Sequence, residues 1–376
     1  MGHVRPVTVL AGPNGCGKTS VLYGVYRALG GALGYRSDDV PDPTEEEIHR
    51  EGGATGWSFE PGRAVVVLDL QYTAEELIAI PKVFAATKSL QKLKADGSVN
   101  APPQLPDGQL TVEWRFPQDV YSDGTPKPIA NLRATPNGGA TWLAGPKYAI
   151  RGWRNRPRPL VEAESLDSIG LLRMFAQNRG KRWVAADERE AFPADEEDAT
   201  QPDYIQRAER RRPTVSNILK VLAEMAQGRR PTGSPIEADF EKRIRDNFAQ
   251  ICAPKRYVGY VYYGPNDEIG TPLLQEGDRQ YPLNMAATGE QVILDYLTQF
   301  VYPRPVNNSI VLIDEPELHL HPKWVRQLFR VLPKMGRGNQ FIMSTHSSEL
   351  RQLAAEDNAL VDLGDLGIAQ GASAHA

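Results

Sequence analysis

Hydrophobic positions along this chain fall into short runs and amphipathic stretches, separated by segments rich in Pro and Gly. Short β-branched or alternating runs predict strands at residues 6–11, 63–70, 109–116, 182–188 and 257–264. Apolar residues at helical spacing predict helices at residues 73–80, 83–95, 165–178, 204–227 and 235–251. The Pro- and Gly-rich stretch 117–160 predicts irregular structure or short hairpins, and the many interruptions argue against a long coiled-coil arm.

Two apolar runs near the C-terminal end each lead into polar residues. The first, Ile310 to Ile313, has four consecutive apolar residues, which is typical of a strand buried on both faces. The second run spans residues 341–345. Pro322 suits the first turn of a helix. The apolar face of that helix is predicted to comprise Trp324, Val325, Leu328, Phe329 and Leu332.

Composition limits the class of protein. The chain has 376 residues, of which 41% are hydrophobic, so it can bury a sizeable core. Its net charge of −4 gives no overall attraction to nucleic acid or anionic membranes, and any such binding requires a local patch. The two cysteines, Cys16 and Cys252, fit a reducing compartment. With no apolar run near the ~20 residues of a membrane span and no secretory signal, we expect a soluble cytoplasmic protein.

Charge is distributed unevenly in the middle of the chain. Between Thr125 and Leu160 there are seven basic residues and no acidic ones, namely Lys127, Arg133, Lys147, Arg151, Arg154, Arg156 and Arg158. Residues 187–198 then carry seven acidic residues and one Arg. The basic block, 127–158, can bind a phosphate backbone or an acidic partner, and Trp153 within it suits stacking on a base. Two solvated surface loops, with Trp153 in a small core, explain the same composition.

The segment from Gly12 to Thr19 fits the pattern G-x-x-x-x-G-K-[ST] at every position, between a predicted strand and a helix. Glycines let the backbone wrap closely around phosphates, and the helix presents its positive end to the same anion. Lys18 is expected to reach the β- and γ-phosphates, and the Thr19 hydroxyl to ligate Mg²⁺. The remaining nucleotide contacts are expected from Asn14, Gly15, Gly17 and Ser20.

Two carboxylates, Asp314 and Glu315, follow the apolar run at 310–313. In open parallel sheets ligands bind beyond the carboxyl ends of the strands. We therefore assign Asp314 to the metal and Glu315 to the general base that activates the attacking water. An acidic pair that caps the next helix is the structural alternative.

His346 stands at the end of the last predicted strand, before a Ser-capped helix. It is the third functional group delivered to the same sheet edge, and we expect it to contact the γ-phosphate or the attacking water. His319 and His321 are weaker candidates for a metal site, because "HLHP" fits a loop entering a helix better.

The segment "NMAATGEQ" precedes an apolar-periodic helix. Thr288 can cap that helix alone. A role for Thr288 and Gly289 beyond capping rests on the other motifs of the chain.

The ordered set GPNGCGKT, ATGEQ, IVLIDEPELHLHP and FIMSTHS resembles the ABC-type ATPase heads of the SMC, Rad50 and RecF group. Within that group it is most similar to bacterial AAA-15/AAA-21 ATPases, which are related to the ATPase domain of OLD-family nucleases. The resemblance covers roughly residues 6–30 and 256–356.

This resemblance implies an α/β P-loop NTPase fold of ABC-ATPase type. It comprises a mostly parallel core sheet, an antiparallel β subdomain and a helical or irregular insertion. The expected division is residues 1–35 and 255–356 for the ATPase core, 36–254 for an inserted lobe, and 357–376 for a tail. ATP and Mg²⁺ are the implied ligands.

The resemblance also implies a shared nucleotide site. Thr288, Gly289 and Glu290 correspond to the Ser-Gly-Glu of the signature motif, which reaches the γ-phosphate bound by a second subunit. Two ATP molecules are then sandwiched in a homodimer or a higher homo-oligomer, and His346 is the switch histidine.

The sequence departs from the family pattern in several places. Thr288 replaces Ser and adds a methyl group. The upstream β-hairpin that often holds adenine is largely missing, and no TOPRIM nuclease region follows His346. The glutamine of the family's glutamine loop has three candidates, Gln71, Gln118 and Gln177.

The favoured function is an ATP-driven dimerising switch in anti-phage defence, with a partner effector that is a nuclease or toxin. The alternative is a RecF-like ATPase of DNA repair, in which the block 127–158 binds DNA. An ATPase subunit of a membrane transporter and a non-enzymatic ATP-binding scaffold are disfavoured. A transporter subunit normally carries a clearer LSGGQ-like signature than this chain has, and the "HLHP" loop departs from the transporter pattern. Glu315 and His346 argue against the scaffold.

Overall fold

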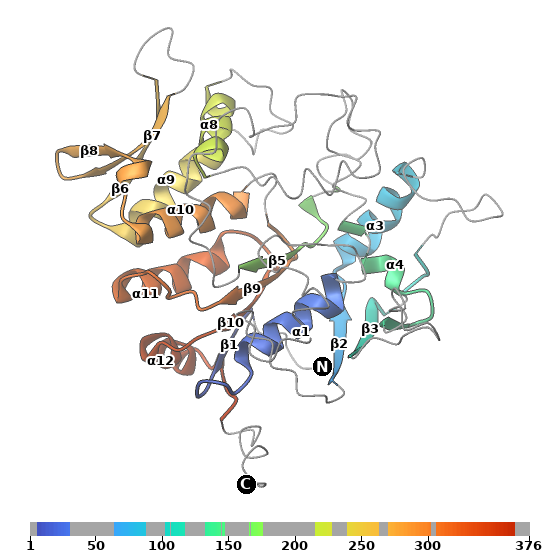
Figure 1. Cartoon of the computed structure of the whole chain (residues 1–376). Helices are drawn as coiled ribbons and strands as arrows, with labels where there is room; N and C mark the ends of the chain where they lie inside the picture. Colours follow the sequence, from blue (N-terminus) through green and yellow to red (C-terminus); the bar gives the residue numbers. More distant parts are fainter. Residues whose placement is uncertain are drawn as a thin grey trace, which may run out of the picture. The chain divides into compact units, whose positions relative to one another are not determined.

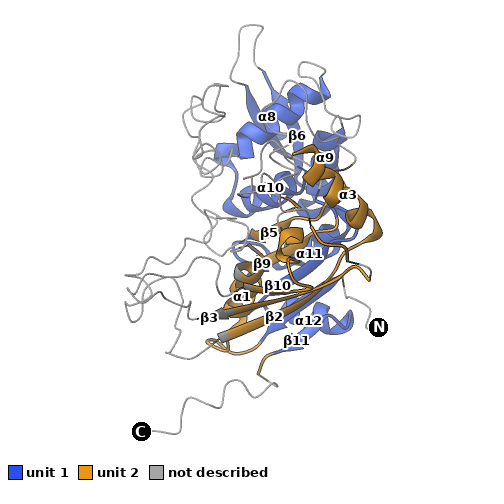
Figure 2. Cartoon of the chain, turned by 90° about the vertical axis from the view of Figure 1, so that its right-hand side faces the viewer, with its two compact units in different colours: residues 1–11, 175–307, 313–362 blue, residues 12–174, 308–312, 363–376 orange. Residues whose placement is uncertain are grey.

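The computed structural model describes residues 6–30, 64–87, 102–105, 107–116, 132–143, 145–146, 165, 167–175, 215–227, 239–262, 270–301 and 306–364. The chain forms two compact units, which Figure 2 colours separately. The first comprises residues 1–11, 175–307 and 313–362, and the second comprises 12–174, 308–312 and 363–376.

Five strands form one sheet in the order β11-β1-β10-β9-β5 (Figure 1). They are β1 (Val7–Ala11), β5 (Leu172–Phe175), β9 (Ile310–Asp314), β10 (Gln340–Ser344) and β11 (Leu360–Asp362). β1 pairs in parallel with both β10 and β11, and Leu10 lies opposite Ser344. The inner strands are fully buried at positions such as Val9 and Leu312, as expected for a parallel sheet covered on both faces. The predicted α/β fold with a parallel core sheet is confirmed.

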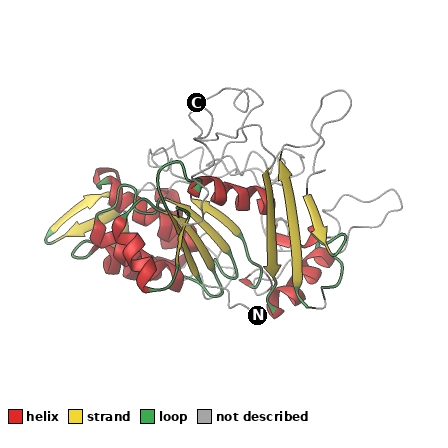
Figure 3. Ribbon diagram, turned by 90° about the horizontal axis from the view of Figure 1, so that it is seen from below, coloured by secondary structure: helices red, strands yellow, loops and turns green. Residues whose placement is uncertain are grey.

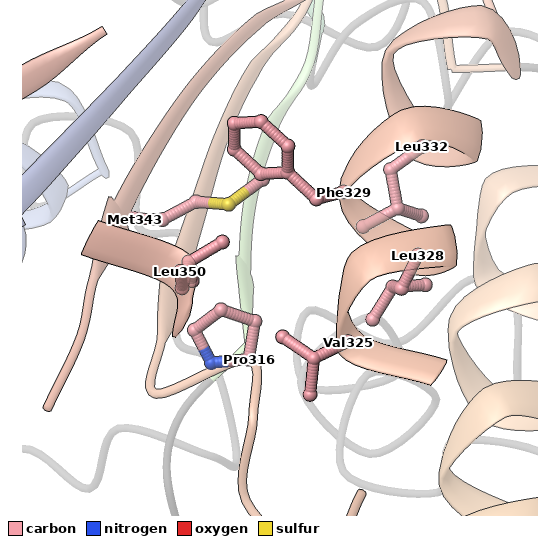
Figure 4. Close-up of a pocket in the computed structure, with 7 residues that line it drawn as sticks. All are labelled: Pro316, Val325, Leu328, Phe329, Leu332, Met343 and Leu350. Carbon is pink, nitrogen blue, oxygen red and sulfur yellow. The ribbon is translucent and has the colours of Figure 1, made fainter. Parts of the chain in front are cut away.

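Among the described residues, the helices of the first unit are α8 (Val215–Ala226), α9 (Phe240–Cys252), α10 (Thr288–Val301), α11 (Pro322–Val331) and α12 (Ser348–Glu356). Two 3₁₀ turns, η6 (Leu283–Met285) and η7 (Leu332–Lys334), adjoin α10 and α11. Apolar side chains at helical spacing form the core, where the ring of Phe300 stacks on Phe341 of β10 with centroids 5.8 Å apart. The apolar face of α11 meets Pro316, Met343 and Leu350 around a small pocket (Figure 4).

A second sheet of the first unit is antiparallel and ordered β6-β7-β8. It comprises β6 (Arg256–Val261), β7 (Thr271–Glu276) and β8 (Arg279–Pro282), which Figure 3 draws in yellow. The tight β7–β8 connection passes through Gly277, whose φ is +58°, a conformation that favours glycine. This sheet leads directly into η6 and α10.

The second unit contains α1 (Lys18–Gly30), β2 (Ala64–Gln71), α3 (Ala74–Ala86), β3 (Gln109–Phe116), β4 (Leu132–Thr135) and α4 (Ala140–Leu143). Its antiparallel sheet has the order β2-β3-β4. α1 packs closely on β2 at Gly24, where a Cβ would lie 3.2 Å from Val66 Cγ2. α3 begins with a capping box between Thr73 and Glu76, whose carboxylate also accepts the N–H of Gly170 at 3.0 Å.

Several predicted elements differ from the structure. Residues 172–175 form β5 rather than part of a helix at 165–178, because a short apolar run suits either element and the pairing with β9 decides between them. Two separate helices are predicted at 73–80 and 83–95. In the structure one helix, α3, runs from Ala74 to Ala86 and includes Pro81. The predicted strand at 182–188 lies outside the described residues.

The predicted domain boundaries remain a prediction, although two strands fall on unexpected sides of them. β5 belongs to the five-stranded sheet although it lies within the predicted lobe 36–254, and β11 lies within the predicted tail 357–376. Cys16 and Cys252 are free, buried thiols. Among the described residues, no helix combines the length and apolar character that crossing a bilayer requires.

Candidate nucleotide site

The phosphate loop begins at Gly12, directly after β1, and ends where α1 begins at Lys18. Gly15 and Gly17 have φ values of +78° and +91°, and a Cβ at either would meet no atom within 4 Å. Their conformation, rather than lack of space, therefore requires glycine. Gly12, with φ +148°, is also crowded, because its Cβ would lie 2.7 Å from Cys16 Sγ.

Lys18 is 5% exposed and lies within the phosphate loop. Its Nζ donates to the carbonyl oxygens of Gly12 at 3.1 Å and Pro13 at 2.9 Å. Asn14, Thr19 and Ser20 are exposed at the loop and the start of α1. The loop therefore surrounds the Lys18 ammonium group with carbonyl oxygens that accept its hydrogen bonds. The oxygens of a phosphate group accept hydrogen bonds in the same way.

Asp314 and Glu315 stand at the carboxyl end of β9. Asp314 is 1% exposed, and its Oδ1 accepts a hydrogen bond from the hydroxyl of Ser344 at the end of β10. The N–H of Glu315 donates to Ser344 Oγ at 3.2 Å and to the Ser344 carbonyl at 3.2 Å. Glu315 also has a φ of +49°, a conformation that costs energy in a residue with a side chain and that clusters at functional sites.

His346 follows β10 by two residues, and its Nε2 lies 3.4 Å from Oε1 of Glu315. The His346 side chain is 41% exposed and that of Glu315 is 14% exposed, so the pair is reachable from solvent. The structure thus brings together two of the residues that the sequence predicts to be catalytic.

Glu317 holds the segment that carries His346. Its Oε1 accepts the hydroxyl of Thr345 at 2.7 Å and the backbone N–H groups of His346 and Ser347 at 2.8 and 2.9 Å. Ser347 in turn caps α12 by accepting the N–H of Leu350. The position of His346 is therefore set by a carboxylate two residues beyond Glu315.

The predicted signature segment begins α10. Thr288 is the first helical residue and is exposed, so it does not occupy the capping position. Instead the carboxylate of Glu290 reaches back and accepts the N–H of Ala287 at 2.6 Å, as the acidic residue of a capping box does. Met285, in the preceding turn, is 73% exposed.

Glu290 is 1% exposed, and its carboxylate is engaged within its own chain. Its Oε1 accepts the hydroxyl of Tyr281 and lies 3.0 Å from Nζ of Lys255. Burial and the hydrogen bond to Glu290 raise the pKa of Tyr281 above its ordinary range. Burial alone lowers the pKa of Lys255, but the hydrogen bond and charge of Glu290 outweigh it, and the net pKa is raised.

Gly289 packs against the loop that follows the acidic strand. A Cβ at Gly289 would lie 2.7 Å from the carbonyl oxygen of His319 and 3.2 Å from the ring of Trp324. His321 caps α11, with its Nδ1 accepting the N–H of Lys323 at 3.2 Å. This contact confirms the prediction that "HLHP" forms the entry to a helix.

Residues 149–351 match a protein family described as "AAA domain, putative AbiEii toxin, Type IV TA system". The matched range covers more than half of the chain and includes Glu290, Asp314, Glu315 and His346, whereas the phosphate loop precedes it. The chain belongs to this AAA-domain family.

Two relatives of this AAA-domain chain are named as probable ATPases of retrons. The "Retron Ec83 probable ATPase" of Escherichia coli is 21% identical over an alignment of 376 residues. This alignment covers 91% of this chain and 64% of the relative. The chain thus spans just under two thirds of that relative's length. The "Retron Vc95 probable ATPase" of Vibrio cholerae serotype O1 biovar El Tor is 52% identical over 44 residues, 11% of this chain and 9% of the relative.

Two solved structures are similar in fold at 13% identity. "Crystal structure of the SmcHead bound to the C-winged helix domain of ScpA" has a TM-score of 0.48 and covers 96% of this chain and 87% of that chain. An Smc head domain with an extended coiled coil, bound to the C-terminal domain of ScpA derived from Pyrococcus furiosus, has a TM-score of 0.45 and covers 95% and 87%.

Other predicted residues of this AAA-domain protein lie outside the described residues. They include Gln118, Gln177, Trp153 and six of the seven basic residues of the block 127–158; the seventh, Arg133, is described and exposed. Gln71, the remaining glutamine candidate, ends β2, and its side-chain amide donates to the carbonyl of Asp107 at 3.0 Å.

Sequence reasoning missed four residues that order this site: Lys255, Tyr281, Glu317 and Ser344. The spacing of Glu290 three residues after Ala287 was the available signal for a capping carboxylate. No comparable local signal exists for Glu317 and Ser344, because their partners lie 28 to 30 residues away in the chain.

Proposed function

We propose that this chain is a cytoplasmic, Mg²⁺-dependent ATPase whose ATP-bound form is a head-to-tail dimer, and that it acts as a switch in anti-phage defence. The retron ATPase relatives and the toxin system in the family description support the defence role. The partner effector is a nuclease or toxin that responds to the dimer. The pair formed by Glu315 and His346 carries the proposal, because it combines a base and a polar contact at one sheet edge.

In this proposal the γ-phosphate transfers to water. The water oxygen bonds to phosphorus as the bond to the β–γ bridging oxygen breaks, and Glu315 takes the proton of the water. His346 contacts the γ-phosphate or the water. Lys18 replaces its two carbonyl partners by β- and γ-phosphate oxygens, while Asn14, Gly15, Gly17 and Ser20 surround the phosphates.

The donor set fits a magnesium ion, because a hydroxyl and a carboxylate are hard oxygen ligands. Thr19 would supply the hydroxyl and Asp314 the carboxylate, whose orientation is held by the Ser344 hydroxyl. When bound, the ion would neutralise charge on the phosphates.

The second half of each site comes from the partner subunit in this proposal. Thr288 is exposed and able to reach an outside phosphate, and Gly289 lies next to it at the N-terminus of α10. Glu290 is buried and already bonded, so we assign it to holding this segment in place instead of contacting ATP.

Complementation between two inactive variants tests the shared site. Lys18→Ala disables the phosphate loop, whereas Thr288→Asp places a negative charge opposite the γ-phosphate without disturbing a buried position. A mixed dimer contains one intact site, built from the Lys18 of one subunit and the Thr288 of the other. Equal mixing should therefore restore roughly a quarter of wild-type ATP turnover, since about half the dimers are mixed and each has one site of two.

Each variant alone should remain inactive, and Glu315→Gln should accumulate as an ATP-bound dimer by light scattering. A mixture that stays inactive, together with a monomeric Glu315→Gln protein in ATP, would rule out the shared site. Phage challenge of cells that carry the chain with its neighbouring genes tests the defence role. If cells with Glu315→Gln were protected as well as cells with the wild-type chain, the defence role would not depend on ATP turnover.

A further inference from the structure

The outer face of α11 and η7 carries a row of basic side chains. Its members, which we call the basic stripe, are all exposed and comprise Lys323, Arg326, Arg330 and Lys334. The stripe contrasts with the chain as a whole, whose net charge is −4. It is also distinct from the basic block 127–158.

Helical geometry places the stripe on one face. The intervals between its members are three, four and four residues, which keep side chains on the same side of a helix with 3.6 residues per turn. The helical backbone continues from α11 into η7, since Val331 and Leu332 both have right-handed helical angles. The row therefore runs along roughly 17 Å, at about 1.5 Å per residue.

The opposite face of α11 is apolar and already buried. Val325, Leu328 and Phe329 point toward Met343 of β10 and Leu350 of α12 around the pocket in Figure 4. An amphipathic helix that binds membranes needs its apolar face free to enter the lipid. The buried face of α11 therefore excludes insertion of this helix into a membrane as an amphipathic helix.

The first charge of the stripe opposes the helix dipole, and the stripe has few acidic neighbours along the chain. No acidic residue occupies the first turn of α11, where Lys323 instead lies at the positive end of the helix dipole. No Asp or Glu occurs between Glu317 and Glu349 in the chain. Glu349 pairs with Arg326, but Lys323, Arg330 and Lys334 form no ion pair with any other described residue.

A further cation adjoins the far end of the stripe. Arg243 of α9 donates from Nη2 to the carbonyl oxygen of Met335 at 2.8 Å, and Asp239 acts on it as the opposing charge. Lys323, Arg330 and Lys334 thus lie on one helix face as exposed cations that form no ion pair with another described residue. A polyanion with regularly spaced charges is the complementary ligand.

We propose that the basic stripe binds the phosphate backbone of duplex DNA, independently of the ATPase function. Duplex DNA carries one negative charge per ~1.7 Å of its axis, so a row of roughly 17 Å faces about five base pairs. Contacts of this kind position a duplex without reading its sequence. The expected binding is therefore strongly salt-dependent and tolerant of sequence.

Salt titration of DNA binding by the full chain tests the stripe. The variant Lys323→Ala/Arg330→Ala/Lys334→Ala removes three charges and leaves the Arg326 ion pair intact. Fluorescence anisotropy with a labelled duplex of about 25 base pairs gives the slope of log K against log salt concentration. Each lost phosphate contact should reduce the magnitude of that slope by about 0.9, so we expect a reduction of about 2.7.

The matched control is Lys82→Ala/Arg256→Ala/Arg279→Ala, which removes the same charge from three exposed positions elsewhere. It should keep the wild-type slope. Equal slopes for both triple variants, or no DNA binding by the wild-type chain at low salt, would overturn the proposal. So would a stripe variant that loses binding to polyglutamate while it keeps its DNA slope, because the stripe would then serve an acidic protein.

Discussion

Replacing Glu317 by alanine tests whether the position of His346 depends on a single carboxylate. The change removes the acceptor for the Thr345 hydroxyl and for the N–H groups of His346 and Ser347. Thr345 is fully buried, so its hydroxyl cannot turn to bulk water, whereas His346 is exposed and its amide can be hydrated. We therefore expect the loss to be dominated by the buried contact.

The magnitude follows from the bonds that are lost. A hydrogen bond to a charged acceptor contributes about 1.5–3 kcal/mol when its partner is left buried and unpaired. The two hydrated amides add a smaller part, comparable to the ~1 kcal/mol of a helix cap. Glu317→Ala should thus destabilise the segment from Thr345 to Ser347 by about 2–4 kcal/mol, or roughly 30- to 1,000-fold in its opening equilibrium.

Hydrogen exchange of a peptide covering residues 341–350 measures that opening in the full chain. ATP turnover should fall at least tenfold, with nucleotide affinity nearly unchanged, because the lost contacts lie with His346 and not with the phosphate loop. Glu317→Gln keeps one carbonyl acceptor and should retain part of both properties. Glu349→Ala, which breaks an exposed ion pair with Arg326, is the control. Exchange and turnover that match this control would refute the reasoning.

Three further predictions concern the signature segment. Gly289→Ala should abolish ATP-dependent dimerisation by light scattering while the monomer still binds a fluorescent ATP analogue, because its Cβ would clash with the His319 carbonyl; dimerisation at the wild-type concentration of ATP would contradict this. Thr288→Ser should keep or raise turnover, since it removes only the methyl group that crowds the proposed site, and a fall in turnover would show that the methyl contributes. The pKa values of Lys255 and Tyr281 are raised in the folded chain, so the unfolded chain loses these protons at lower pH and stability should fall above about pH 10. Tyr281→Phe should make the fall of Tm with pH shallower in that range. An unchanged dependence of Tm on pH would show that Tyr281 does not contribute to it.

The strands and loops with strong local signals could be predicted from the sequence. The alternating run at 109–116 forms β3, and the apolar run at 310–313 forms most of β9. The prediction of a helix over 165–178 is wrong at residues 172–175, because a short apolar-rich run fits a helix or a strand until a neighbouring strand supplies hydrogen bonds. The edge strand β11 has three residues, too few for a period to be visible.

In the candidate site, too, the residues with strong sequence signals could be predicted and the others could not. Gly15 and Gly17 follow from a motif whose backbone conformation dictates glycine, and the structure shows those conformations. The contact between Glu315 and His346 followed from the rule that parallel strands deliver functional groups to one edge. The direction of the Glu290 side chain did not follow, because a carboxylate at a helix start can face a ligand or cap its own helix. The buried Tyr281 and Lys255 decide between these possibilities.

The loop after the acidic strand connects the proposed functional segments of the first unit. At the start of the loop, the N–H of Glu315 donates a hydrogen bond to Ser344. In the middle of the loop, the carboxylate of Glu317 accepts the N–H of His346. At its end, the carbonyl of His319 lies against Gly289. Glu315 and His319 both have positive φ, so this conformation costs energy and persists only while those contacts hold it. A change at His346 that loosens Glu317 would therefore also loosen the support of Gly289. In an ATP sandwich this route would link hydrolysis at one site to the grip of the same subunit on the other ATP.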